Sequence, residues 1–241
     1  MNKRIKLTDR ILPDYLKGEE IMNTVTHIVG GGLSVIALLL CVLKSCLKHD
    51  LTAIITSSVY GFALICLYTM SSVYHGLRPS AGKKVMQVLD HCTIYFLIAG
   101  TYTPIVLCSI RQLYPILGWC LFAAEWSLAF FAVTLTAIDL RKYRVFSMIC
   151  YIGMGWAIIL FLPQAMASLT KNGFYLTLAG GIAYTIGAVL YGIGSKKHWM
   201  HSIFHIFVVL GSILQFFAIF LYVLSIEPPG SEQTLRLFCK Q

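Results

Sequence analysis

The chain has 241 residues, of which 58% are hydrophobic and 12% are charged, and its mean hydropathy is +0.77. Soluble domains carry about 25% charged residues, so this composition excludes a soluble protein and predicts an all-α, multi-pass protein of the cell membrane. The net charge of +9 is typical of basic cytoplasmic loops in such a protein, and we expect membrane lipids and not nucleic acid as partners.

Seven apolar runs are long enough to cross a bilayer, for which about 20 residues are needed. Polar or basic breaks such as LKSCLKHD and DLRKYR separate them. We therefore predict one seven-helix transmembrane domain over residues 21–225, preceded by a leader at 1–20 and followed by a tail at 226–241. The expected spans are 22–43, 51–76, 86–109, 113–138, 144–163, 173–194 and 199–224.

The leader is polar and ends without a small-residue cleavage site, so we expect the first span to be retained and not removed as part of a signal peptide. Two descriptions of the leader remain open. Ile5, Leu12, Tyr15 and Leu16 fit a short helix lying on the membrane surface, and the polar composition fits an unstructured tail equally well.

Lys and Arg residues are distributed unevenly between the two sides of the predicted bundle. Thirteen of the 19 lie in the leader and in the loops after spans two, four and six, and six lie on the other side. Basic residues are enriched in cytoplasmic loops. The bias predicts a cytoplasmic N-terminus and an external C-terminus.

Three other features have structural interpretations. The eight cysteines are scattered and form no CxxC pair, so we interpret them as small packing residues and not as a disulfide or thiolate framework. Gly30, Gly31 and Gly32 follow no predicted strand, which favours close helix packing over phosphate binding. Glu125 lies deep in span four without an evident partner.

The predicted orientation gathers ionisable residues at the cytoplasmic ends of four spans. Ionisable residues inside spans are rare and tend to face functional cavities. A histidine at a span end can equally be a simple interfacial residue, so each one taken alone is ambiguous. The gathered residues are His27, His75, Asp90, His91, His201 and His205.

Spacing indicates what these residues can do. His201 and His205 are four apart and therefore share one helix face, as do Ser71 and His75. Two histidines at this spacing can bind one metal ion, and three imidazoles with one water form the usual catalytic zinc shell. Ser202 occupies the position at which a zincin helix carries its glutamate, so Asp90 is the candidate base.

With these residues assembled, the chain resembles the hemolysin III family, the bacterial branch of the progestin and adipoQ receptor group, which is related to the alkaline ceramidases. The motifs that carry the resemblance occur in order along the chain. They are E-x-x-N-x-x-x-H at Glu20, Asn23 and His27, S-x-x-x-H at Ser71 and His75, the aspartate of LDH at Asp90, and H-x-x-x-H at His201 and His205.

The resemblance implies a seven-helix bundle that holds zinc through His75, His201 and His205. It also implies that a water lies between the metal and Asp90 and that Ser71 supports the site. Two functions follow as expectations. The first is zinc-dependent hydrolysis of lipid amides or esters at the cytoplasmic face, and the second is a non-enzymatic cytolytic or membrane-homeostasis role with a structural zinc. The sequence identifies no protein partner.

Overall fold

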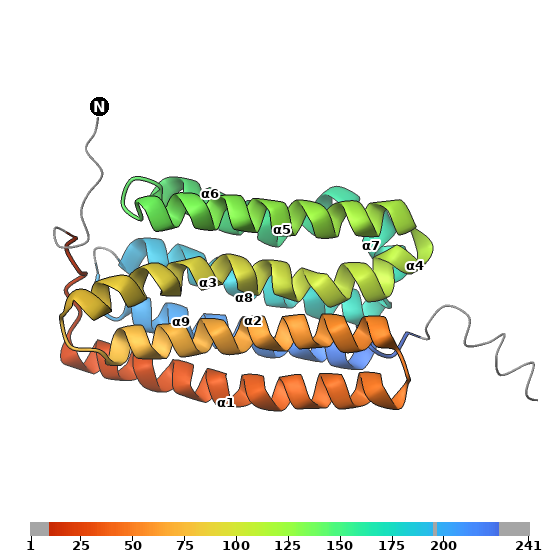
Figure 1. Ribbon diagram of the computed structural model, residues 1–241, viewed down its shortest axis with the longest axis horizontal. Coiled ribbons are helices and arrows are strands. Elements are labelled where there is room, and N and C mark those ends of the chain that lie inside the picture. Colours follow the sequence, from red (N-terminus) through yellow and green to blue (C-terminus); the bar gives the residue numbers. More distant parts are fainter. Residues whose placement is uncertain (1–9, 195–196, 227–241) are drawn as a thin grey trace, which may run out of the picture.

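The structure is a computed structural model, which describes residues 10–194 and 197–226. Seven helical spans run roughly parallel to one another (Figure 1), which confirms the predicted all-α bundle of seven spans. The described part of the chain contains no strand. Its elements are α1 (Lys17–Leu47), α2 (Leu51–Gly76), α3 (Ala81–Ile105), η2 (Val106–Ile110), α4 (Arg111–Leu113), α5 (Pro115–Ile138), α6 (Arg144–Trp156), η3 (Ala157–Phe161), α7 (Leu162–Ser168), α8 (Lys171–Gly194), α9 (Met200–Ala218) and η4 (Ile219–Val223).

Four of the described spans extend two to five residues beyond the predicted bounds at one or both ends, and the other three match them to within two residues. Polar residues that accept the first backbone amides set where some helices begin, and hydrophobicity alone does not detect them. Asp50 accepts the amide of Ala53 at the start of α2, and Ser80 accepts the amide of Lys83 at the start of α3. The third span continues from α3 through the π-helical η2, which begins two residues after Pro104. A proline inside a helix removes one backbone hydrogen bond and disturbs the turn before it.

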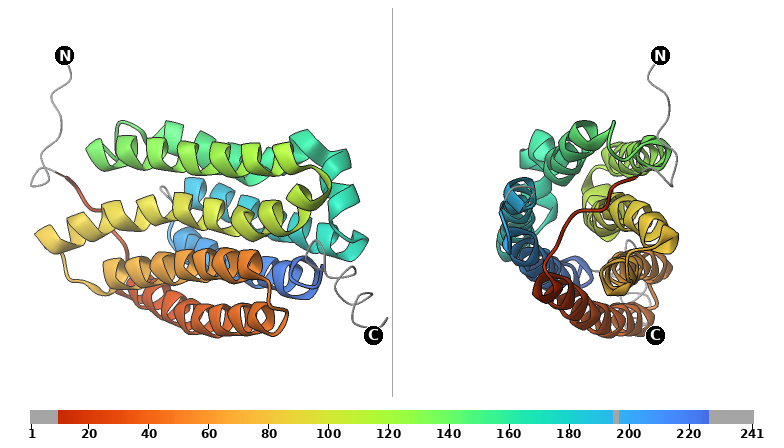
Figure 2. Two further views of the ribbon diagram at one scale, coloured as in Figure 1. Left: turned by 45° about the vertical axis from the view of Figure 1, so that its right-hand side comes forward. Right: turned by 90° about the vertical axis from the view of Figure 1, so that its left-hand side faces the viewer.

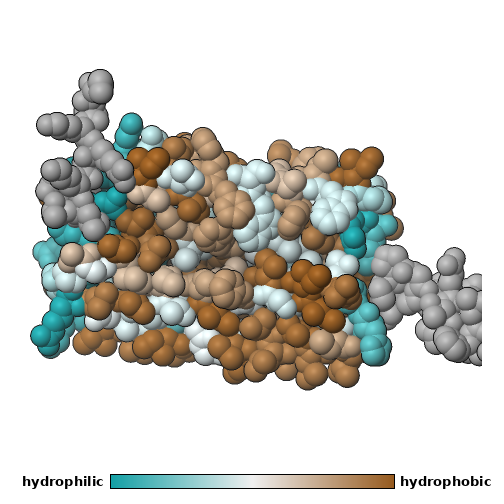
Figure 3. Space-filling view, in the orientation of Figure 1, coloured by the Kyte–Doolittle hydropathy of each residue, from teal (hydrophilic) through white to brown (hydrophobic). Residues whose placement is uncertain are grey.

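The surface of the bundle is suited to lipid. The face drawn in Figure 3 is mostly apolar across its middle and hydrophilic at its two ends. Many large apolar side chains are exposed, including those of Leu39, Phe62, Phe130 and Leu160. A chain with such a surface is a membrane protein.

The end-on view in Figure 2 shows the helices arranged around the centre of the bundle. In this arrangement α1 packs against α2 and α9, α8 packs against α9, and α2 packs against α3. The starts of α1, α3 and α9 and the end of α2 consequently meet at one end of the molecule (Figure 1). The residues that the sequence analysis gathered lie at this end.

The structure also shows the surroundings of the glycine run, the cysteines and Glu125, which the sequence analysis interpreted structurally. A Cβ atom on Gly30 would lie 2.5 Å from Cε1 of Tyr68, whereas one on Gly32 would meet nothing within 4 Å, so only the first glycine of the run is required for close packing of α1 on α2. The seven described cysteines are free, as predicted. Glu125 is buried, and its Oε2 atom has no hydrogen-bond partner in the described part of the chain.

Residues 10–16, which we call the N-terminal segment, do not form the surface helix that was one of our two descriptions of the leader. They are irregular and cross the end of the bundle before α1 begins at Lys17, as the right-hand view of Figure 2 shows. Pro13 lies inside the segment and is incompatible with a helix interior. Ile5, the first of the four residues named for that surface helix, lies outside the described residues.

Candidate metal centre

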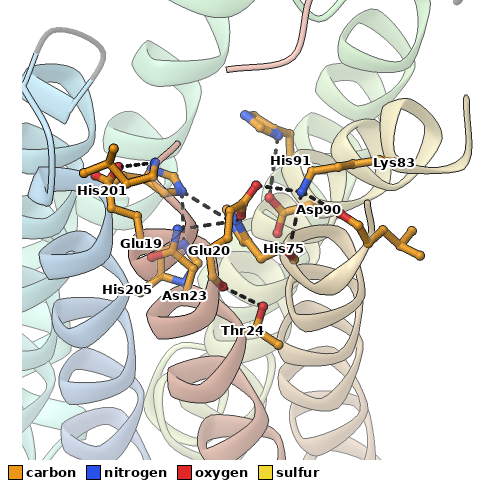
Figure 4. Close-up of polar contacts among 12 residues, drawn as sticks. Glu19, Glu20, Asn23, Thr24, His75, Lys83, Asp90, His91, His201 and His205 are labelled. Carbon is orange, nitrogen blue, oxygen red and sulfur yellow. Dashed lines mark hydrogen bonds and ion pairs between the residues drawn. The ribbon is translucent and has the colours of Figure 1, made fainter. Parts of the chain in front are cut away.

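Three buried histidines meet between α2 and α9 (Figure 4). His75 lies in the last turn of α2, and His201 and His205 lie one turn apart at the start of α9. The Nε2 atom of His201 is 3.4 Å from Nε2 of His75 and 3.1 Å from Nε2 of His205. One ring nitrogen from each residue lies within 4.8 Å of the others, so the three nitrogens converge on one point.

This convergence fits a metal ion. Three neutral imidazoles that aim the same nitrogen at one point cannot all be satisfied by hydrogen bonds to one another, because each neutral ring has only one N–H. Imidazole nitrogens suit Zn²⁺ and other transition metals. Within the described part of the chain, no fourth His, Cys, Asp or Glu joins the cluster, and three protein ligands are typical of catalytic zinc sites.

Glu20 orients His75 from the neighbouring helix α1. Its Oε2 atom lies 2.6 Å from Nδ1 of His75, and its Oε1 atom lies 2.6 Å from Nζ of Lys83. Lys83 is buried and also donates to the carbonyl oxygen of Leu77 at 2.9 Å. A carboxylate that accepts the Nδ1 proton fixes the tautomer and leaves Nε2 free to bind a metal. The sequence singled out Glu20 but missed Lys83.

Glu19 positions the start of α9, as Glu20 positions the ring of His75. Its carboxylate accepts the backbone amides of Leu16 and Trp199, the residue that caps α9, and lies 3.1 Å from Nδ1 of His198. Trp199 has a φ of 67°, which is unusual for a residue other than glycine. Glu19 therefore holds this unusual backbone turn in place, and with it the start of the helix that carries His201. His198 is exposed at the surface and still contacts this carboxylate.

His27 and Asn23 lie beside the cluster on α1. The ring of His27 is 3.9 Å from that of His205, centre to centre, and contacts the ring of Tyr68 edge-on. Both nitrogens of His27 are buried without a hydrogen-bond partner among the described residues. Nδ2 of Asn23 is 3.4 Å from Nδ1 of His75. Neither residue belongs to the three-histidine cluster, and both form its wall toward α1.

An inner cavity of about 150 Å³ adjoins the cluster. Ser71, Asp90, His201 and His205 line it at this end, and its lining extends along α9 to Gln215. From His201 to Gln215 the helix rises about 21 Å, so the cavity is long and narrow. Ser71 is buried. The side chain of Asp90 accepts no hydrogen bond from a described residue, which leaves its carboxylate free to meet a molecule in the cavity.

His91 faces away from the cluster. Its Nδ1 donates to the carbonyl oxygen of Gln87 at 2.8 Å, and its Nε2 is 3.1 Å from the hydroxyl of Tyr191. Its Nδ1 atom is also 3.8 Å from Oδ2 of Asp90. The structure thus assigns His91 to the wall of the cavity and not to the converging nitrogens.

Tyr15 of the N-terminal segment reaches the cluster from the end of the bundle. Its ring stacks on that of His201 with centres 4.8 Å apart and lies 5.6 Å from that of His75. Burial raises the pKa of the Tyr15 phenol, so the hydroxyl stays neutral and remains a donor. No spacing rule could place this residue, because an irregular segment carries it back over the bundle.

Comparison with known proteins agrees with this geometry. The model of the Haemolysin-III related family matches residues 15–216, a range that includes every residue of the centre described above. The chain belongs to the Haemolysin-III related family. Family membership confirms the resemblance that the motifs indicated.

Three relatives show how far the similarity extends. The chain is 39% identical to hemolysin-3 of Bacillus cereus over 206 residues, which cover 86% of this chain and 92% of that protein. It is 33% identical to the hemolysin-3 homolog of Bacillus subtilis (strain 168) over 208 residues, or 86% and 96% of the two chains. It is 27% identical to the monocyte to macrophage differentiation factor of Homo sapiens over 235 residues, or 92% and 91%. The similarity covers most of this chain and most of each relative.

Proposed function

We propose that this protein is a zinc-dependent hydrolase of lipid amides or esters, with zinc held by His75, His201 and His205. One observation carries the proposal. The cluster has three converging imidazoles and no fourth protein ligand among the described residues, and it borders a long, mostly apolar cavity. A structural site normally has four protein ligands, whereas a catalytic site keeps one position open.

A bound zinc lowers the pKa of water to about 7 and polarises a carbonyl oxygen. The protein residues do the rest of the chemistry. Asp90 borders the same cavity end as the cluster and lacks a hydrogen-bond donor within the described structure, so it is suited to accept a proton from water and return it to the leaving amine or alcohol. Ser71 offers a hydroxyl on the same wall, where it can orient the substrate carbonyl.

Substrate geometry supports a lipid. The inner cavity is narrow and its lining includes Leu67, Ile94, Ile98 and Val208, which suit an acyl chain. The cluster lies near one polar end of the bundle. We infer that this is the depth of the amide or ester group of a membrane lipid. We infer from the distribution of Lys and Arg residues that this end is cytoplasmic.

The names of the relatives favour a second candidate function. Two of them are called hemolysin-3 or its homolog, and a cytolytic or membrane-homeostasis protein could use the same histidines as a structural clamp between α2 and α9. In that case the metal would stabilise the bundle and no lipid would be cleaved. The two candidates therefore differ in whether Asp90 has a chemical task.

The test compares wild type, zinc-stripped wild type and Asp90→Asn in liposomes that contain ceramides, N-acyl amides and phospholipids. We expect wild type to release fatty acid only when zinc is present. Asp90→Asn should keep most of its zinc and lose about 10²–10⁴-fold in rate, the usual contribution of a positioned base. Zinc binding by both proteins without fatty-acid release from any lipid in the panel would refute the hydrolase and favour the clamp.

A further inference from the structure

A second cavity opens at the same end of the bundle as the histidine cluster. This mouth cavity has a volume of about 650 Å³ and is bounded by the N-terminal segment, α3, the loop between α5 and α6, α8 and the start of α9. Three arginines line it from separate parts of the chain. They are Arg10 of the N-terminal segment, Arg141 of the loop after α5 and Arg144 at the start of α6.

Among the described residues, none of these guanidinium groups forms an ion pair with a carboxylate of the cavity. Oδ1 of Asp139 already accepts the backbone amides of Arg141 and Lys142, at 3.1 and 3.0 Å. The Glu19 carboxylate is likewise occupied by backbone amides and His198. Asp14 is the remaining acidic residue of the lining, and its side chain is exposed.

Arg10 provides the strongest evidence for an anion site in this cavity. Its Nη1 atom is buried and has no hydrogen-bond partner within the described residues. A buried charged donor without a partner is costly. A small anion in the cavity would remove that cost, and several arginines around one space are typical of phosphate sites, because the planar guanidinium donates two parallel hydrogen bonds to a phosphate.

The mouth cavity also adjoins the inner cavity. Both are lined by His91, Met148, Tyr151, Tyr191 and His201. A molecule with an anionic head and an apolar tail can therefore place the head among the arginines and the tail between the helices. The bond between head and tail would then lie close to His201.

We propose that the mouth cavity binds a phosphate-bearing anion through Arg10, Arg141 and Arg144. The adjacency of the two cavities favours the phosphate of a membrane lipid, although a soluble phosphate has the same recognition chemistry. The inference deepens the proposed function, on which its substrate assignment rests, because it gives the headgroup class of the lipid. Binding itself requires no turnover and can be measured separately.

The experiment measures equilibrium binding of four probes to the purified full chain in detergent. Radiolabelled dioleoyl phosphatidate is compared with dioleoylglycerol, which has the same chains but no phosphate, and with inorganic phosphate and glycerol 3-phosphate as competitors. We expect phosphatidate to bind at least about 10-fold more tightly than dioleoylglycerol, and Arg10→Gln and Arg144→Gln each to remove most of this preference. Arg78→Gln, at the same end of the bundle but outside the cavity, should keep it.

Two further variants separate folding from recognition. Arg10→Lys and Arg144→Lys keep the charge and lose the two-pronged hydrogen bond, so we expect an intermediate loss of affinity with unchanged thermal unfolding in the absence of probe. Displacement of phosphatidate by glycerol 3-phosphate or inorganic phosphate at equal affinity would support the anion site and identify a soluble source. Equal binding of phosphatidate and dioleoylglycerol, or an unchanged preference in both glutamine variants, would overturn the proposal.

Fatty-acid release is assayed in the same samples, together with Asp90→Asn. Arginine-dependent binding without any release would support the anion site while contradicting the proposed hydrolase. Fatty-acid release at the same rate in wild type and in both glutamine variants would support the proposed hydrolase and contradict the anion site.

Discussion

The Nδ1 atom of His75 lies 2.6 Å from Oε2 of Glu20. With its Nδ1 proton donated to this carboxylate, the imidazole presents the lone pair of Nε2 toward His201 and His205. The carboxylate is itself held by Lys83. A metal-binding geometry is therefore built into the contacts among α1, α2 and α3, and it is completed by the first two turns of α9.

The first prediction concerns Glu20. Glu20→Gln should remain folded and bind zinc about 10–100-fold more weakly, because a neutral amide no longer raises the basicity of His75 or fixes its tautomer. Competition with a chelator of known affinity measures the change. Asp50→Asn is the matched control, since it makes the same chemical change at the other end of α2, where the side chain caps the helix. Equal zinc affinities for Glu20→Gln and wild type would show that Glu20 does not orient the ligand.

A second prediction uses the glycines of α1. Gly30→Ala should lower the free energy of unfolding by about 1–3 kcal/mol, the usual cost of overpacking, because the new methyl group would meet the Tyr68 ring, which is fixed by a 2.7 Å hydrogen bond to Ser212. Gly32→Ala should be neutral or stabilising by up to about 1 kcal/mol, since it meets nothing and favours the helix. Thermal unfolding in detergent compares the two. A similar effect of both substitutions would contradict the packing of α1 on α2 described above.

A third prediction concerns orientation. In a background without other cysteines, Cys46 at the exposed end of α1 should react on whole cells with a thiol reagent that cannot cross the membrane. Lys142→Cys, in the loop between α5 and α6, should react only after the cells are permeabilised. These outcomes follow from the concentration of Lys and Arg residues on the histidine side. The reverse pattern would place the metal centre at the external face.

The sequence predicted the spans closely because hydrophobicity and length reflect the thickness of the bilayer directly. It also predicted that His201 and His205 share a face, since an i, i+4 spacing does so in any helix. That His75 joins them follows from the bundle, in which the end of α2 and the start of α9 lie at the same end. The motif resemblance indicated this meeting, and hydrophobicity alone could not.

Other parts of the site depend on tertiary contacts that spacing does not encode. Asp90 and His91 are adjacent in sequence, but successive side chains on a helix diverge by about 100°, so His91 turns to Tyr191. Glu19 was overlooked because its partners, the backbone amide of Trp199 and His198, lie about 180 residues away. Tyr15 reaches His201 only through an irregular segment, for which no periodicity exists.

The most direct test of the metal centre is X-ray absorption spectroscopy at the zinc edge of the purified, zinc-loaded protein. We predict three imidazole nitrogens at about 2.0–2.1 Å and one light oxygen ligand, which is the coordination of an open three-histidine site. His205→Ala should lower the number of imidazole ligands or abolish zinc binding. A shell containing sulfur at about 2.3 Å, or a spectrum that is unchanged in His205→Ala, would contradict a zinc site built by His75, His201 and His205.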